Sequence, residues 1–508
     1  MSATRGDGKG ATVGYLAVAL VVVATLLLTG CSRGAPSHPG TGSDTGLLPG
    51  ASEGPLPPTG GPAVEGPPPA GSASTGAVPE APAAPPATVK GGTGTATDRV
   101  ASEVVAGVEQ FWREQFPVQF GRRWVNIRDF EAVDPGNAGV PAPCLHRALD
   151  LADQALYCSR LDTVAWDRVG LLPKLRGRYG DGAVLVALAH EIGHAVQDRL
   201  GIDAAAQVRE PDRYPTILLE AMADCFAGVV VQAAVDGRIT TPRMTPADLD
   251  RAMRALLSFR DPVGVAISRT AHGDSFDRAS AFQDGYRNGA GSCADMTVRN
   301  QTFTQRGYTS LSDIMQGGNL TLDQLLTSMA PDANAWFGNL VTSRGGTWRT
   351  SLVTVPVVSR CAAPNLSRQG PARYCPGSGA VTTSAGDLAK VHDGLGDYAS
   401  AELVASRYAL AALDALGRPV RGDAAGRTAV CLTGAYTRAL LDRSTGGTAD
   451  QGSFELSPGD VDEAVQELLD QDFAARDTSG LAPGGDLGFE RIEQFRAGTL
   501  GGPASCGI

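Results

Sequence analysis

The sequence predicts a predominantly helical α+β fold that occurs twice in tandem, behind an export signal and an unstructured linker. Three observations support this prediction. A length of 508 residues exceeds what one hydrophobic core usually serves. Apolar residues recur at helical spacing over residues 181–200 and 216–236. Landmarks of Cys, Trp and Gly-Asp also recur in the same order in the two halves of the chain.

The first thirty residues predict a lipoprotein signal peptide. Arg5 and Lys9 precede an apolar run over residues 11–29, and a Gly-Cys pair ending at Cys31 follows directly. This arrangement resembles the bacterial lipobox, which implies that Cys31 is lipidated and becomes the mature N-terminus. The alternative is an uncleaved signal anchor, because the run is just long enough to span a bilayer. Both interpretations tether the chain to the membrane on the extracytoplasmic side, because the positive flank stays inside.

Residues 31–98 predict a disordered tether. They are rich in Pro, Gly, Ser, Thr and Ala and show no periodic apolar pattern. Such a composition cannot bury enough apolar surface to offset the entropy of an ordered chain. The net charge of −11 argues against a nucleic acid partner, because binding nucleic acid requires a cationic surface.

The helix predicted over residues 181–200 has Asp181 as its expected N-cap and Gly201 just beyond its end. Gly193 lies in its interior, where Gly costs about 1 kcal/mol relative to Ala. We therefore expect another part of the backbone to approach the helix closely at this position.

The same helix carries an HExxH motif. His190 and His194 lie one turn apart, so both imidazoles can reach one metal ion. Glu191 lies next to that position, where it can contact a metal-bound water. The alternative is a pair of hydrogen-bonded histidines on a surface helix.

A catalytic zinc ion needs a third protein ligand and one open coordination position. The next predicted helix, residues 216–236, offers Glu220 and Asp224 among apolar residues. We assign Glu220 as the third ligand, and Asp224 as the acceptor for the free ring N–H of a zinc-bound histidine. The alternative exchanges these roles and makes Asp224 the ligand.

HEIGH followed by Glu-x-x-x-Asp-Cys resembles the bacterial family of putative neutral zinc metallopeptidases, which are similar to gluzincins. Residues 155–158 and 163–167 resemble the strand segment of that family, and His272-Gly273 resembles its later His-Gly segment. The resemblance covers about residues 100–298 and implies a zincin-like fold, a zinc ion and peptidase activity. One departure is that the Gln-Arg usual in the later segment is Asp277-Arg278 here.

These roles define an expected mechanism. Zinc lowers the pKa of a bound water towards 7 and polarises the scissile carbonyl. Glu191 takes the proton of that water and later delivers it to the leaving amine. His272 is the candidate donor to the developing oxyanion. The alternative for His272 is a helix-capping or core histidine.

Residues 99–300 and 320–508 are interpreted as tandem copies of one fold. Gly180-Asp181 recurs as Gly396-Asp397, and Trp112 and Trp124 have counterparts in Trp336 and Trp348. Three further segments also match: Cys225-Phe226-Ala227-Gly228 with Cys431-Leu432-Thr433-Gly434, Thr245-Pro246-Ala247-Asp248-Leu249-Asp250 with Ser457-Pro458-Gly459-Asp460-Val461-Asp462, and Phe276-Asp277-Arg278 with Phe489-Glu490-Arg491.

The second copy lacks every proposed site residue. Its positions that correspond to His190, Glu191, His194, Glu220, Asp224 and His272 are Ser406, Arg407, Leu410, Gly426, Val430 and Gly485. We therefore expect one Zn²⁺ per chain, in the first copy only, and a pseudo-enzyme domain after it.

The nine cysteines support an exported protein with disulfide bonds. Eight remain when Cys31 is set aside, and disulfides persist outside the cytoplasm. If both copies pair internally and identically, three schemes remain. The favoured scheme joins Cys144 to Cys158, Cys225 to Cys293, Cys361 to Cys375 and Cys431 to Cys506.

The sequence thus predicts a membrane-anchored, extracytoplasmic zinc metallopeptidase that acts on a peptide or protein substrate. Two alternatives stay open: a non-catalytic scaffold or binding lipoprotein on the same fold, and a zinc amidase that acts on cell-wall peptides. The oligomeric state is left open.

Overall fold

The computed structural model describes residues 87–508 except 240, 268–270, 356–365 and 447–453, and these residues belong to one compact unit. We call residues 87–300 the first half, 301–319 the connecting segment and 320–508 the second half. The expected signal peptide, Cys31 and residues 31–86 of the expected linker lie outside the described residues. Ordered structure begins before the expected boundary at residue 98, because Lys90 already hydrogen-bonds Phe130 and Ala132.

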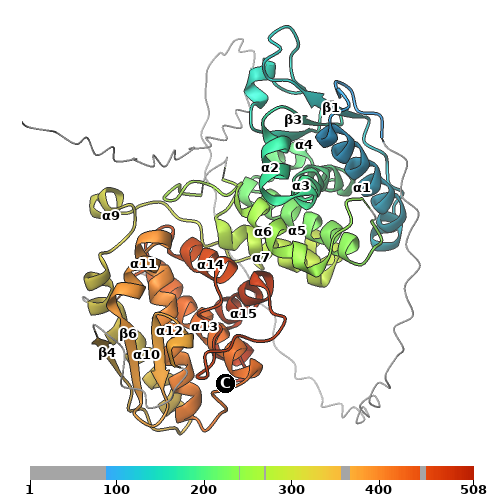
Figure 1. Cartoon of the computed structure of the whole chain (residues 1–508). Helices are drawn as coiled ribbons and strands as arrows, with labels where there is room; N and C mark the ends of the chain where they lie inside the picture. The colour runs from blue at the N-terminus through green and yellow to red at the C-terminus, as the bar shows by residue number, and fades with distance from the viewer. Residues whose placement is uncertain (1–86, 240, 268–270, 356–365, 447–453) are drawn as a thin grey trace, which may run out of the picture. The chain divides into compact units, whose positions relative to one another are not determined.

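The first half is mostly helical and contains one small sheet (Figure 1). Its sheet has the order β1-β3-β2, with β1 parallel and β2 antiparallel to β3. The elements are α1 (Ala96–Phe120), β1 (Asp129–Val133), η1 (Ala148–Leu151), β2 (Ala155–Cys158), β3 (Thr163–Asp167), α2 (Leu171–Tyr179), α3 (Asp181–Leu200), α4 (Ala204–Arg209), α5 (Thr216–Val235), η2 (Pro246–Asp248), α6 (Leu249–Leu257), α7 (Ser275–Asn288) and α8 (Ala290–Ala294).

The second half repeats the order of the main elements, although α4 and η2 have no separate counterparts among its described residues. Its sheet has the order β4-β6-β5, again with one parallel and one antiparallel pair around the central strand. After α9 (Leu311–Gln316) in the connecting segment, the elements are α10 (Leu322–Ser343), β4 (Ser351–Val355), η3 (Leu366–Gln369), β5 (Ala372–Cys375), β6 (Ala380–Ser384), α11 (Ala385–Leu395), α12 (Asp397–Ala415), α13 (Asp423–Gly446), α14 (Asp460–Asp470) and α15 (Gly488–Ser505). The predominantly helical α+β class is thereby confirmed.

Helix α3 spans the predicted residues, but its N-cap differs from the prediction. Gly180, with φ 87°, is the N-cap, and Asp181 is the first residue of the helix. A left-handed φ suits Gly, whereas Asp181 places its carboxylate in the first turn and pairs with Arg176 at 2.6 Å. The helix ends at Gly201, as predicted.

Helix α5 packs against α3 through Gly193. A Cβ atom at Gly193 would lie 2.9 Å from the carbonyl oxygen of Ala223, so the expected close approach is confirmed. Among the described residues, α5 is the single helix long and apolar enough to cross a membrane, but 89% of its apolar window is buried inside the protein. These features are those of a core helix that carries polar side chains at selected positions.

Close helix contacts of the same kind occur in both halves. A Cβ at Gly228 on α5 would lie 2.0 Å from the Phe282 carbonyl oxygen on α7. The corresponding Gly434 on α13 would meet the Phe495 carbonyl oxygen on α15 at 2.0 Å. Only Gly allows the backbones to approach this closely, so both helix pairs use the same packing solution.

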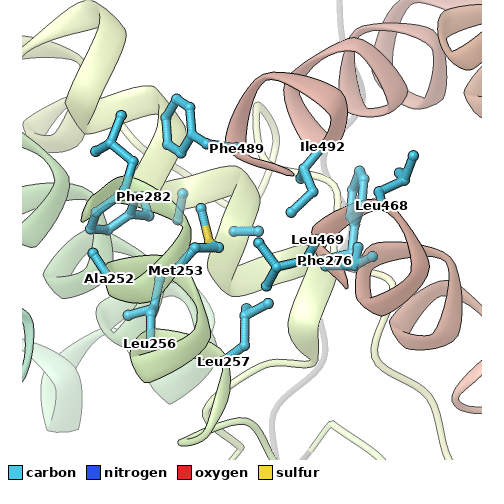
Figure 2. Packing of buried hydrophobic residues seen from close by; sticks show 14 of the residues in the cluster. Ala252, Met253, Leu256, Leu257, Phe276, Phe282, Leu468, Leu469, Phe489 and Ile492 are labelled. Atoms are coloured by element: carbon cyan, nitrogen blue, oxygen red, sulfur yellow. The ribbon is translucent and has the colours of Figure 1, made fainter. Parts of the chain in front are cut away.

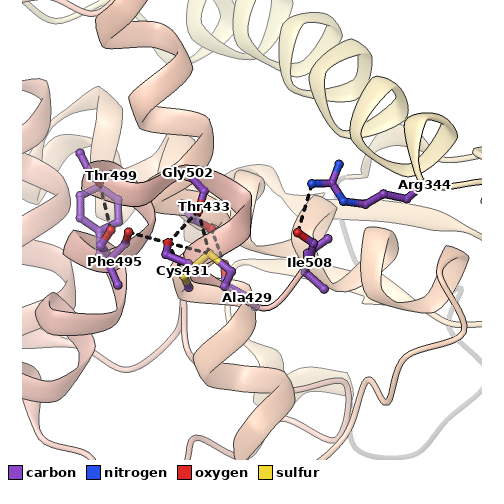
Figure 3. The surroundings of a disulfide bond; sticks show 11 residues. Arg344, Ala429, Cys431, Thr433, Phe495, Thr499, Gly502 and Ile508 are labelled. Carbon is purple, nitrogen blue, oxygen red and sulfur yellow. Dashed lines mark hydrogen bonds between the residues drawn. A yellow bond between two sulfur atoms is a disulfide. The ribbon is translucent and has the colours of Figure 1, made fainter. Parts of the chain in front are cut away.

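The described disulfides join three of the expected pairs: Cys144–Cys158, Cys225–Cys293 and Cys431–Cys506. Cys375 is also disulfide-bonded, and its expected partner Cys361 lies outside the described residues. Figure 3 shows the bond at Cys431, between α13 and the C-terminal end of α15. Nearby, Arg344 donates to the carbonyl oxygen of the terminal residue Ile508 at 3.1 Å.

One hydrophobic cluster extends through both halves. Figure 2 shows where it passes from the first half to the second, between helices α6 and α7 on one side and α14 and α15 on the other. Met253, Phe276 and Phe282 of the first half lie in the same cluster as Leu468 and Phe489 of the second. The two halves therefore share a core rather than being joined only by the connecting segment.

Candidate metal centre

Helices α3 and α5 bring the three predicted ligands together. The Nε2 atom of His190 lies 3.2 Å from Oε2 of Glu220, and Nε2 of His194 lies 3.7 Å from Oε1 of the same carboxylate. One possible ligand atom from each of the three residues lies within 4.8 Å of the others. Both imidazoles and the carboxylate therefore face a common point.

The opposite ring nitrogens of the two histidines have partners of their own. Nδ1 of His190 lies 2.7 Å from Oδ1 of Asp224, and Nδ1 of His194 lies 3.1 Å from Oε1 of Gln197. Gln197 is oriented in turn, because its amide nitrogen donates to the carbonyl oxygen of Leu219 at 2.5 Å. Each ring thus has an acceptor at Nδ1, which favours the tautomer with a free Nε2 lone pair.

Asp224 lies behind His190 and is completely buried. The same oxygen, Oδ1, also accepts from Nη2 of Arg278 at 2.8 Å, and Arg278 donates to the carbonyl oxygen of Phe259 at 3.2 Å. Asp224 therefore contacts the outer nitrogen of His190, while Glu220 faces the inner nitrogens. This geometry favours Glu220 over Asp224 as the ligand.

The protein groups of the centre interact strongly with one another. Burial lowers the pKa of His190, but the negative charges of Asp224 and Glu220 outweigh this effect and raise it to about 10. Burial raises the pKa of Glu220, but the cationic forms of His194 and His190 bring it well below its usual range. The centre is thus a strongly coupled set of donors, in which a cation can replace the protons.

Glu191 projects from the same turn of α3 but is not among the three ligands. Burial raises its pKa, and the neighbouring Glu220 adds to this effect, although His190 and His194 oppose it. A carboxylate with a raised pKa binds a proton more readily than a solvated one, as a general base requires.

The donor set fits zinc. Two imidazole nitrogens and one carboxylate oxygen are the ligands of many catalytic zinc sites, and hydrogen bonds at both Nδ1 atoms fix the inner nitrogens for coordination. His190, His194 and Glu220 would hold the ion and leave a fourth position open.

His272 lies beside this centre and is held by Asp261. Its ring Nδ1 lies 3.1 Å from Oδ1 of Asp261, and its backbone N–H donates to Oδ2 at 2.7 Å. Burial lowers the pKa of His272, but the bond to Asp261 and the charge of Glu220 raise it overall, so the ring is within electrostatic range of Glu220. The structure thus holds His272 with its Nδ1 side turned to Asp261.

Asp277, which departs from the family pattern, binds the connecting segment. Its Oδ1 accepts from the backbone N–H of Thr304 at 2.7 Å, and its Oδ2 from that of Gln305 at 3.3 Å. Gln305 also donates to Oδ2 of Asp261 at 2.9 Å. Asp277 therefore joins the start of α7 to the chain that follows the first half.

The corresponding positions in the second half are filled by buried residues, except for the exposed Gly485 opposite His272. Leu410 and Val430 are fully buried, and Arg407 is 1% exposed. Arg407, which replaces Glu191, donates to the carbonyl oxygens of Phe473 at 2.6 Å and Arg476 at 2.8 Å. Among the described residues, these positions offer no set of metal ligands.

A second cluster in the second half contains only carboxylates. Asp397 on α12 lies close to Asp460 and Glu463 on α14. Burial and the mutual repulsion of their charges raise the pKa of Asp460, and raise that of Glu463 to about 9. Burial likewise raises the pKa of Asp397. The cluster lacks the imidazoles of a zinc site, so we assign it no catalytic role.

Three supporting residues were missed in the sequence. Gln197 follows His194 by three residues on the same helix, so helical spacing alone could have indicated it. Arg278 was quoted as part of a motif but not as the partner of Asp224, and Asp261 belongs to a loop without any local signal. Such partners are set by tertiary contacts rather than by spacing.

A search of the curated proteins and one of the solved structures found no significant match to this chain. The scan of family models did find one, described as "Putative neutral zinc metallopeptidase". It covers the sheet, the ligand-bearing helices α3 and α5, and the His272 segment. The first half of the chain therefore matches this zinc metallopeptidase family over residues 79–296, which confirms the resemblance seen in its motifs.

Proposed function

We propose that this chain is a zinc-dependent peptidase whose active site lies in its first half. The observation that carries the proposal is the convergence of His190, His194 and Glu220, with both histidines supported at Nδ1. A purely structural pair of histidines would not need a third donor facing both inner nitrogens.

Bound zinc would supply an activated water and a Lewis acid for the substrate carbonyl. Glu191 would serve as the general base that accepts a proton from the attacking water and returns it to the leaving amine, a task for which its raised pKa is suited. His272 donates a hydrogen bond to the carbonyl oxygen as that oxygen gains charge. Asp224 and Gln197 keep the two imidazoles in position throughout the reaction.

The sheet supports a peptide substrate. Strand β2 is at the edge of the sheet and lies next to α3, the helix that carries Glu191. Extended peptides bind by adding a strand to such an edge. A peptide paired with β2 would therefore run past the proposed base.

The broader proposal places this peptidase on the extracytoplasmic side of a membrane, anchored through Cys31. The apolar run over residues 11–29 and three disulfides in the described part of the chain support this location. We also propose that the second half is a copy of the first that has lost its metal site. Its matching element order, sheet pairing and disulfide positions support that origin.

The test is a digest of a peptide library by the full chain with zinc, compared with Glu191→Gln. Loss of the base should lower the rate about 10²–10⁴-fold, while Glu114→Gln, an exposed change on α1, should leave it unchanged. Metal analysis should give one zinc per chain, lost on His190→Ala. If neither wild type nor Glu191→Gln cleaves any peptide, a non-catalytic scaffold is favoured. If only cell-wall peptides are cleaved, an amidase is favoured. Two zinc ions per chain would contradict the proposal that the second half has lost its metal site.

A further inference from the structure

The two halves contact each other through matching carboxylates. Asp250 on α6 accepts from the backbone N–H groups of Gly488 and Phe489 at the start of α15, both at 2.9 Å. Asp462 on α14, its counterpart in sequence, accepts from the backbone N–H of Ser275 at the start of α7 at 2.6 Å. Each half therefore caps a helix of the other, where the helix dipole favours a negative charge.

The aromatic contacts between the halves are reciprocal as well. Phe276 lies against Phe495 with ring centroids 6.2 Å apart, and Phe282 lies against Phe489 at 6.4 Å. Phe276 corresponds to Phe489 in sequence, and Phe282 corresponds to Phe495 by the same offset, so the two contacts join the same pair of positions with the halves exchanged. Contacts of residue i with j and of j with i define an isologous interface, as in a two-fold dimer. The second half thus occupies the place of a dimer partner of the first.

The contacts made by Asp250 and Asp462 differ in the segment of chain that each one fixes. Asp250 reaches a helix of the second half, where no metal ligand remains. Asp462 is 7% exposed and reaches the first half at two points, because its Oδ2 also accepts from Nε of Arg260 at 3.1 Å. His272 lies between Arg260 and Ser275 in the sequence. Asp261, the hydrogen-bond partner of its ring, directly follows Arg260. One carboxylate of the second half therefore holds both ends of the segment that presents His272.

We propose that Asp462 is a positioning residue for His272, so that the second half keeps the active site of the first in a productive geometry. This inference rests on the proposed peptidase function. A donor to an oxyanion is effective only when it is held in place before charge develops, and a shift of about 1 Å can cost as much as 10²-fold in rate. Asp462 acts through the backbone and through Arg260, without contact with the ligands.

The test compares Asp462→Asn with Asp250→Asn in the full chain. Both substitutions weaken the same kind of contact across the same interface, but only the first affects the His272 segment. We expect Asp462→Asn to lower kcat about tenfold, a fraction of the 10²–10³-fold effect of losing such a donor, with KM nearly unchanged. Asp250→Asn should keep kcat within about twofold of wild type, and both should keep one zinc per chain. An equal loss of kcat in the two variants would overturn the proposal, because it would indicate general loosening of the interface.

Hydrogen exchange provides a readout that does not need activity. Asp462→Asn should speed exchange in peptides that contain Arg260 or Ser275, and Asp250→Asn in peptides that contain Gly488. Unchanged exchange near Arg260 and Ser275 would contradict the inference even in an active enzyme. If wild type cleaves nothing but the exchange pattern is as expected, the peptidase proposal fails while the positioning contact stands.

A second variant guards against misfolding of Asp462→Asn. Arg260→Ala removes a side chain that is 39% exposed and leaves the Ser275 contact in place. It should lower kcat by about threefold, less than Asp462→Asn, because one of the two attachment points is lost. Full activity of both Arg260→Ala and Asp462→Asn would overturn the proposal. If Asp462→Asn does not fold, full activity of Arg260→Ala alone would overturn it.

Discussion

Replacement of Asp224 tests the support of the metal centre. Asp224 is fully buried, binds Nδ1 of His190 at 2.7 Å and accepts from Arg278 at 2.8 Å. Loss of such an outer partner typically weakens metal binding about 10–100-fold, which corresponds to about 1.4–2.7 kcal/mol. We expect Asp224→Ala to fall in this range.

The same substitution should also lower the free energy of unfolding. Arg278 is 3% exposed, and removal of one member of a buried ion pair costs about 3–5 kcal/mol. The loss should lie nearer 3 kcal/mol, because Arg278 keeps its bond to the carbonyl oxygen of Phe259. Asp224→Asn preserves the shape of the side chain and an acceptor for His190, so it should cause smaller losses of both kinds.

The assay is competition for zinc with a chelator of known affinity, together with thermal unfolding of the metal-free protein. Asp236→Asn is the matched control, since it changes an exposed carboxylate just beyond the end of the same helix. A folded Asp224→Ala protein with the zinc affinity of wild type would refute the assigned role of Asp224.

Three further predictions concern stability. Gly193→Ala should destabilise the protein by about 1–3 kcal/mol, because the added methyl group would overpack against α5. Gly177→Ala has open space around it and should stabilise the protein by about 0.5–1 kcal/mol. Thermal unfolding of both variants separates the effect of packing from that of helix propensity. The pKa of Glu463 is raised from 4.5 to about 9 in the folded state. Between these two values the folded state holds a proton that the unfolded state has lost, so the free energy of unfolding should fall as pH rises through this window. Denaturant titrations from pH 5 to 8 should show a shallower decline for Glu463→Gln, and an identical slope would contradict the raised pKa. Cys225→Ser opens a loop of 68 residues, and Cys144→Ser opens one of 14 residues. The entropy of the unfolded chain therefore predicts that Cys225→Ser lowers the free energy of unfolding by about 1.4 kcal/mol more than Cys144→Ser does. Equal unfolding midpoints in urea for the two variants would count against this account.

The ligands could be predicted from local spacing because a helix converts sequence separation into direction. His190 and His194 are one turn apart wherever α3 lies, and their HExxH pattern indicates metal chemistry without knowledge of the fold. Glu220 was found because a carboxylate among apolar residues must have a buried partner. The boundaries of α3 and α5 also followed from the apolar pattern and from Gly201, although the cap at Gly180 did not, since its left-handed backbone is imposed by the turn from α2.

The role proposed for the second half rests on contacts between residues about 200 positions apart. Asp462 has no feature in sequence that relates it to His272, and Asp261 and Arg278 likewise gain their meaning only from the loops and helices that pack around them. The repeated Cys and Gly-Asp landmarks indicated a second copy, but not that its helices would cap those of the first.

The order of amino acids was thus sufficient to predict the helices, to propose the metal ligands and the absence of such ligands from the second half, and to favour a cysteine pairing of which three bonds are seen. These are properties of short segments, in which side-chain direction follows from backbone geometry. The partners of the ligands and the contact between the halves emerged only from the folded chain. Loops have no fixed period, and the packing of one helix on another depends on the shapes of both surfaces.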